Sequence, residues 1–227
     1  MNHSVLHSSI VEQSERAGAQ KAERTVAGTK PLRVLIVAPS LDILGGQAIQ
    51  AARLLARLSE EPSLEVAFLP INPRLPGPFR KLQSIKYVRT ILTSVLYWAL
   101  LFARVRRYDI IHVFSASYFS FLLAPTPAIL VAKLFGKKIV LNYRSGEAAD
   151  HLLRWRRTAI PTIRLVDEIA VPSGYLVDVF AQFGLAARPI FNFVDTDRFR
   201  FKERHPLRPI FLSNRNFEPL YNVSCVL

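Results

Sequence analysis

The sequence predicts an α/β fold, a doubly wound Rossmann-like parallel sheet with helices on both faces. Short runs rich in β-branched residues alternate with longer stretches of helical apolar period. The short runs are apolar at nearly every position, as strands buried on both faces require. Half of the 227 residues are apolar, which is enough for one full domain core.

The expected elements can be placed in chain order. Six strands are predicted at residues 33–38, 64–69, 110–114, 138–142, 168–171 and 189–191. Helices are predicted at residues 47–58, 84–105, 117–135 and 173–183, and the third should break near Pro125 and Pro127, because proline interrupts helical hydrogen bonding. Ser173 is a good N-cap for the last helix, which ends at Gly184. These elements make residues 31–192 one domain.

The segments on either side of this domain differ from it in composition. Residues 1–30 have no periodic apolar face and no signal-peptide pattern, so we expect a disordered tail. Residues 193–209 are charged and contain proline, which is typical of a linker. Residues 210–227 hold one apolar strand and part of a helix, which is too little for a separate core. We expect them to be the truncated start of a second domain.

The net charge of +13 indicates an anionic partner. Between Asn72 and Arg107 the sequence has no acidic residue, and residues 91–103 carry no charge. Cations on both sides of an apolar centre favour an anionic membrane surface over specific nucleic-acid binding. The uncharged centre is too short for a membrane span. The alternative to a helix on the membrane surface is a buried helix with a solvated basic rim. With its single cysteine, Cys225, the chain is expected to be cytoplasmic, and the alternative is a peripheral location at the inner face of the membrane. The cations in this region are Arg74, Arg80, Lys81, Lys86, Arg89, Arg104, Arg106 and Arg107.

Two groups of residues follow predicted strand ends, where ligands of open α/β sheets bind. Gly45 and Gly46 precede Gln47 at a helix start, where backbone N–H groups can approach a phosphate; the alternative is a flexible turn. The later strands end in Ser115 and Ser117, and in a loop from Tyr143 to Glu147. There Arg144 could bind a phosphate or carboxylate and Glu147 could bind sugar hydroxyls, or the two could form a surface ion pair.

Other sites receive less support. His112 lies in an apolar strand and is expected to be structural, whereas His151, beside Asp150 and on a helix, is an acid/base candidate. The histidine and cysteine spacing fits no metal site, and there is neither a nucleophile elbow nor a dinucleotide fingerprint. The sequence therefore predicts no metal and no cofactor.

The assembled motifs resemble glycosyltransferase family 4, retaining enzymes of GT-B fold. The most specific is the segment from Asn192 to Phe199, which resembles the hinge pattern N-x-V-D-x-x-x-F between the two domains of that family. The resemblance covers about residues 32–227. The matching segments are RVLIVAPSLDILGGQA, YDIIHVFSAS, GKKIVLNYRSGEAADHL, EIAVPSGYLVDVF, FNFVDTDRF and PIFLSNRNFEPLYNV.

The resemblance implies that the N-terminal domain binds a sugar or lipid-linked acceptor and that a C-terminal domain binds a nucleotide-sugar donor. It implies a donor-diphosphate role for Arg215, although Tyr221 and Asn222 stand where the family often has Lys-Gly. The family's paired glutamates would lie beyond Leu227. We therefore expect this chain to bind acceptor without transferring sugar by itself. The alternative is a non-catalytic module that binds a membrane surface or a phosphate ligand.

Overall fold

A computed structural model of the chain describes residues 30–41, 45–75, 85–115, 117–193, 196–203, 205–206 and 223–226. The chain divides into two compact units after Asn192, the position at which the linker is predicted to begin. In the second unit the described helical turns are η3 (Thr196–Arg198) and η5 (Val223–Val226). Arg215 and the strand predicted at residues 210–213 lie outside the described residues, as does the tail predicted at residues 1–30 apart from Lys30.

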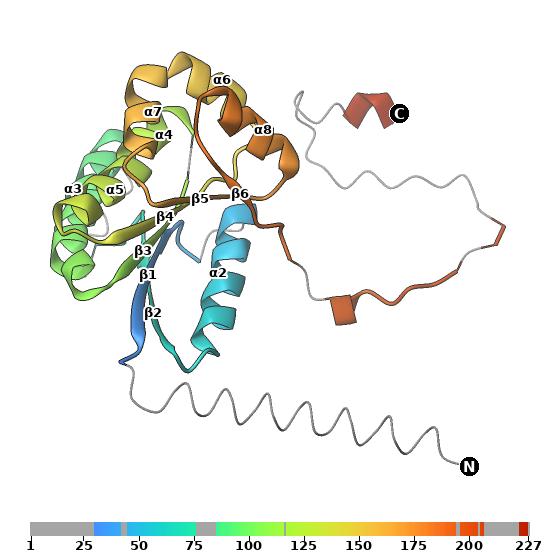
Figure 1. The fold of residues 1–227 in the computed structure, drawn as a ribbon, viewed down its shortest axis with the longest axis horizontal. Coiled ribbons are helices and arrows are strands. Elements are labelled where there is room, and N and C mark those ends of the chain that lie inside the picture. Colours follow the sequence, from blue (N-terminus) through green and yellow to red (C-terminus); the bar gives the residue numbers. More distant parts are fainter. Residues whose placement is uncertain are drawn as a thin grey trace, which may run out of the picture. The chain divides into compact units, whose positions relative to one another are not determined.

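The first unit is built on one six-stranded sheet whose strands are all parallel, in the order β2-β1-β3-β4-β5-β6 (Figure 1). The α/β prediction is confirmed. The last strand is shorter than predicted, because Ile190 and Phe191 extend past it into solvent. The strands are β1 (Leu32–Ala38), β2 (Leu64–Pro70), β3 (Ile110–Phe114), β4 (Lys138–Asn142), β5 (Glu168–Val171) and β6 (Arg188–Pro189).

The connecting helices follow the predicted ones, with one addition. The helix expected at residues 117–135 is two helices that meet at Ala124, and Pro125 opens the second one, where a missing N–H costs no helical bond. The pair α6 and α7 has no predicted residue range, although His151 was expected on a helix and lies in α6. The helices are α2 (Gly46–Ser59), α3 (Lys86–Arg104) with the 3-10 turn η2 (Val105–Arg107), α4 (Tyr118–Leu123), α5 (Pro125–Leu134), α6 (Ala148–Arg154), α7 (Arg156–Ile163) and α8 (Gly174–Gln182).

The two faces of the sheet bury separate cores. Leu35 and Val113 face one core, into which α3 through α8 pack, whereas Ile36 and Phe114 face a smaller core under α2. Among the described helices only α2 covers the second face. Parallel crossovers are right-handed, so the single step from β1 to β2, opposite in direction to all later steps, places its helix on the opposite face.

Carboxylates tie the strands together at the amino-terminal edge of the sheet. Asp109 accepts hydrogen bonds from the backbone N–H, Nε and Nη2 of Arg33 at 3.0, 3.2 and 3.0 Å, which lowers the pKa of Asp109 to about 2. Asp167 accepts in the same way from the N–H of Ile139 and from Nζ of Lys138. Arg33 and Lys138 at this edge are therefore paired with carboxylates.

Candidate functional site

The loops that follow β1 and β3 flank the point where the strand order changes direction. From β1 the chain moves to β2 on one side, and it then crosses β1 to place β3 on the other side. Ligands of open α/β sheets bind in the crevice outside the carboxyl ends of the strands at such a point. Gly45 and Gly46 follow β1, while Ser115 and Ser117 follow β3. The structure thus brings two of the three predicted loops to the switch point, and the third, from Tyr143 to Glu147, follows β4 at the same edge.

The glycine pair opens α2. Gly45 is the N-cap residue, and its carbonyl accepts the N–H of Ile49 at 3.0 Å. Among the described residues no side chain caps this helix, and its first turn, which includes half-buried Gln47, has no acid. Neither glycine has a positive φ, and an added Cβ would meet no atom within 4 Å at either position. The fold itself therefore does not require glycine here.

The guanidinium group of Arg144 is fixed in position at the carboxyl edge by three contacts. Its Nε donates to Oδ1 of Asn142 at 2.8 Å, its Nη1 donates to Asn192, and its guanidinium lies over the Phe114 ring, 5.5 Å from the centroid. No carboxylate pairs with it within the described part of the chain, so the predicted ion pair with Glu147 is not formed. The Glu147 side chain is exposed, and its N–H donates to Ser145 Oγ at 3.3 Å.

His112 is held in the neutral form by the same network. Asn142 Nδ2 lies 3.0 Å from His112 Nε2, and because Asn142 Oδ1 is occupied by Arg144, the amide donates and the imidazole accepts. Burial, and then the charge of Arg144, lower the pKa of His112 to about 4. The structural role predicted for His112 agrees with these contacts.

His151 is a buried core residue, which corrects its prediction as an acid/base candidate. It has no exposed surface, and its ring packs against those of Tyr118, Phe121 and Tyr143. Its Nδ1 hydrogen-bonds to Tyr143 Oη at 2.8 Å, and burial lowers its pKa to about 4. A base without access to solvent or substrate cannot exchange protons with a ligand at this edge.

Tyr143, Ser115 and Ser117 differ in the solvent exposure of their side chains. Tyr143 is also fully buried, so in this structure it holds His151 and does not present its hydroxyl to solvent. Ser115 is 1% exposed, and its N–H donates to the Asn142 carbonyl. Ser117 is half-buried, with its Oγ 3.4 Å from Tyr143 Oη. The next residue, Tyr118, has φ +53°, an uncommon conformation for a bulky residue that concentrates at functional sites.

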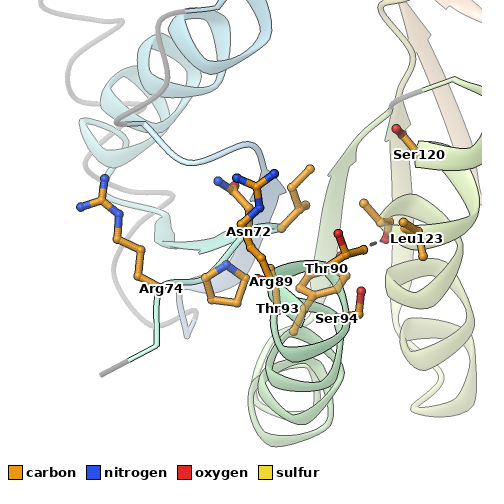
Figure 2. A pocket seen from close by; sticks show the side chains of 12 residues that line it. Asn72, Arg74, Arg89, Thr90, Thr93, Ser94, Ser120 and Leu123 are labelled. Carbon is orange, nitrogen blue, oxygen red and sulfur yellow. Dashed lines mark hydrogen bonds between the residues drawn. The ribbon is translucent and has the colours of Figure 1, made fainter. Parts of the chain in front are cut away.

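A cavity of about 520 Å³ lies beside the switch point, between the loop after β2 and helices α3 and α4 (Figure 2). Asn72 joins it to the loop after β1, because its Oδ1 accepts the N–H of Ser40 at 2.9 Å. The hydrogen bond from Tyr97 Oη to the Ala124 carbonyl, 2.9 Å long, fixes α3 against α4 at its floor. The polar residues that line it are Asn72, Arg74, Arg89, Thr90, Thr93, Ser94 and Ser120.

The lining of this cavity combines cations and hydroxyls with an apolar floor and includes no acid. Figure 2 shows Arg89 extending from α3, with Arg74 pointing away from the other labelled side chains. Sequence reasoning missed this site, although a signal was present: Thr90, Thr93, Ser94 and Tyr97 share one face of an otherwise apolar helix. Such a lining suits an anionic group attached to an apolar body.

The polar groups at this edge include both hydrogen-bond donors and an acceptor. Within the described ranges no three histidine, cysteine, aspartate or glutamate side chains gather into a possible metal site. The donors at this edge are backbone N–H groups at α2, hydroxyls and the guanidinium group of Arg144, and the exposed carboxylate of Glu147 is an acceptor. Comparison of the chain with protein-family models and with curated protein sequences gave no match.

Proposed function

We propose that this chain is the acceptor-binding half of a retaining glycosyltransferase that uses a nucleotide-sugar donor. The observation that carries the proposal is the strand order, which puts the predicted glycine and serine loops at the switch point of a parallel sheet. The motif resemblance adds the reaction class, which the fold alone does not specify.

The contacts of Arg144 support an anion-binding role for this edge. Its hydrogen bonds go to two neutral amides, Asn142 and Asn192, so its charge is fixed in position without being neutralised within the described residues. A guanidinium group held in this way suits bidentate contact with a phosphate or carboxylate. The open space around Gly45 and Gly46 leaves room for a ligand close to the first backbone N–H groups of α2.

The cavity beside the switch point suggests what kind of acceptor fits. Arg89 and the hydroxyls of Thr90 and Ser94 can bind a phosphate, while the floor at Tyr97 and Leu123 can hold an apolar chain. We therefore assign the acceptor to the lipid-linked class, with the nucleotide-sugar donor held by the second domain that the resemblance implies. The contribution of this chain to catalysis would be to position the acceptor hydroxyl against that donor.

Calorimetric titration with a short-chain prenyl phosphate and with its glycosylated counterpart tests this proposal. We expect the glycosylated compound to bind more tightly, and Arg144→Gln to weaken it about tenfold, the loss of one charge-assisted contact. Arg156→Gln on α7 is the matched control and should change nothing. Equal affinity for the two compounds, with no effect of Arg144→Gln, would contradict the acceptor assignment.

A non-catalytic phosphate-binding module is the second candidate, favoured by the acid-free lining of the cavity. It predicts that the two prenyl phosphates bind equally and that Arg89→Gln weakens both. The same titrations therefore separate the two functions, because only an acceptor site gains affinity from the sugar.

A further inference from the structure

The outer face of α3 carries a continuous and exposed apolar stripe. Its members are spaced by four, four, three and four residues, which places them on one side of the helix. Their exposed fractions run from 38% to 77%. We call these residues the α3 stripe: Tyr87, Ile91, Val95, Trp98 and Phe102. In Figure 1, α3 lies at the outside of the helical layer.

The opposite face of α3 explains why this helix is not simply an exposed apolar segment. Tyr97, Leu101 and Val105 are at most 1% exposed and belong to the main core. Arg104 also donates from Nη1 to the Phe68 carbonyl at 3.2 Å, which ties the helix to β2. One face of α3 thus packs on the sheet. The packing of the core does not require the apolar residues of the stripe on the other face.

The segment Tyr87–Arg107 is long and apolar enough to cross a membrane by length and composition. A crossing would, however, pull Tyr97, Leu101 and Val105 out of the core. The geometry therefore favours a helix that lies along a membrane surface while it stays packed on the sheet.

Helix α5 widens the apolar surface. Phe102 stacks on Trp98 at 6.0 Å between ring centroids and meets the edge of Phe135 at 6.2 Å, at the end of α5. Leu130 and Leu134, one turn apart on α5, are 44% and 70% exposed. The α3 stripe with these two leucines forms what we call the α3–α5 surface.

Four cations border this surface. Arg89 lies near the start of α3, Arg106 and Arg107 follow its end, and Lys133 lies on α5, all with exposed side chains. Among the described residues none of these four forms an ion pair. A surface of this composition attracts negative charge at its rim and excludes water at its centre.

We propose that the α3–α5 surface docks on an anionic lipid bilayer, with the stripe in the interface and the arginines on lipid headgroups. Tryptophan and tyrosine favour that interface, and each surface cation is attracted by anionic lipid. A second copy of the chain would place the same cations against one another, so charge disfavours that occupant. Docking also brings the cavity at Thr90 and Ser94, on the neighbouring face of α3, close to the headgroups; only this consequence rests on the proposed function.

Flotation with vesicles tests the docking on the unmodified 227-residue chain. We expect binding to phosphatidylcholine vesicles that contain phosphatidylglycerol, little binding to phosphatidylcholine alone, and release as salt screens the charges. A second readout uses Trp155→Phe, which leaves Trp98 as the only tryptophan. Its fluorescence should shift to shorter wavelength and resist an aqueous quencher when anionic vesicles are added.

Paired substitutions on the α3–α5 surface and away from it test where the chain contacts the membrane. Val95→Glu should lower vesicle affinity at least tenfold, whereas Leu153→Glu on α6 should not, although both side chains are 63% exposed. Arg106→Gln with Arg107→Gln should weaken binding and flatten its salt dependence, whereas Arg156→Gln with Arg157→Gln on α7 should have much less effect.

Three results would overturn the proposal. The first is no flotation with anionic vesicles at low salt. The second is equal loss of binding in the α3 variants and their controls, which would mean that net charge alone attracts the chain. The third is a concentration-dependent dimer that Val95→Glu abolishes, without vesicle binding, because the stripe would then be an interface between copies.

Discussion

Arg144 donates from Nε to Oδ1 of Asn142 across 2.8 Å, and this bond fixes the orientation of a buried amide. The other end of that amide then faces His112 Nε2 at 3.0 Å. Side chains from β3, β4 and the following loop thus share one arrangement, in which Arg144 is charged and His112 is neutral. The carboxyl edge of the sheet is therefore preorganised around one cation.

Asn142→Asp should raise the pKa of His112 above its present value of about 4. A carboxylate in this position accepts from both Arg144 and a protonated imidazole, so it favours the charged histidine. The measurement is an NMR titration of the His112 ring protons. Asn142→Ala is the control, because burial continues to keep the pKa low there. A pKa of His112 unchanged in Asn142→Asp would show that the network is not formed.

His151 should make the protein less stable in mild acid. Its pKa is about 4 when folded against 6.5 for an ordinary histidine, so the unfolded chain binds more protons between these values. The contribution of His151 to the free energy of unfolding is fully present above pH 6.5. It falls as the pH drops toward 4, by about 1.4 kcal/mol per pH unit and about 3 kcal/mol in all. His151→Phe, which fits the aromatic surroundings, should make urea unfolding less dependent on pH between 7 and 5. An unchanged slope would contradict this assignment.

Asp109 should affect the stability of the protein in a lower pH range than His151 does. Its pKa of about 2 lies below the ordinary 3.8, so its stabilisation is present above pH 3.8 and is lost as the pH falls through 2. Asp109→Asn should lower the urea midpoint at pH 7, and its difference from the unmodified chain should shrink in strong acid. Glu60→Gln is the control, since the Glu60–Arg57 pair is exposed on both sides and should contribute little.

Gly184→Ala should destabilise the first unit by about 1–2 kcal/mol, the cost of a left-handed conformation for a residue with Cβ. Gly184 ends α8 with φ +68°, and an added Cβ meets no atom within 4 Å, so the loss comes from the backbone alone. Gly146→Ala, at a position with equal space and no positive φ, should be neutral or slightly stabilising. Equal effects of the two substitutions in thermal unfolding would contradict this account.

Much of the fold could be predicted because buried parallel strands and capped helices leave local signals. The strands at residues 110–114, 138–142 and 168–171 agree with the prediction at both ends, and Ser173 caps α8 through its Oγ as expected. His151 lies on a helix as predicted, but no residue range was predicted for α6 or α7. They are short and interrupted at Trp155, and Pro161 lies inside the second, so neither displays a full apolar period. Their stability comes from packing, which a local pattern does not report.

The candidate site was only partly predictable. Strand ends identified Gly45, Ser117 and Arg144 at one edge, because the topology of a parallel sheet brings such ends together. The partners of Arg144 and the burial of His151 depend on side-chain packing between distant segments. The cavity at Arg89 was missed because its hydroxyls lie on a helix that is otherwise apolar, and the cations near them were considered only as flanking charges of that helix.

The central claim is that the carboxyl edge between β1 and β3 binds the acceptor. Amide chemical-shift mapping of the isotope-labelled chain, titrated with a glycosylated short-chain prenyl phosphate, tests it most directly. We expect the shifts to concentrate at Gly45, Gly46, Ser117 and Arg144 and along α3 near Arg89, with the opposite edge at Arg33 and Asp109 unaffected. Shifts confined to that opposite edge, or none at any residue up to millimolar ligand, would contradict the claim.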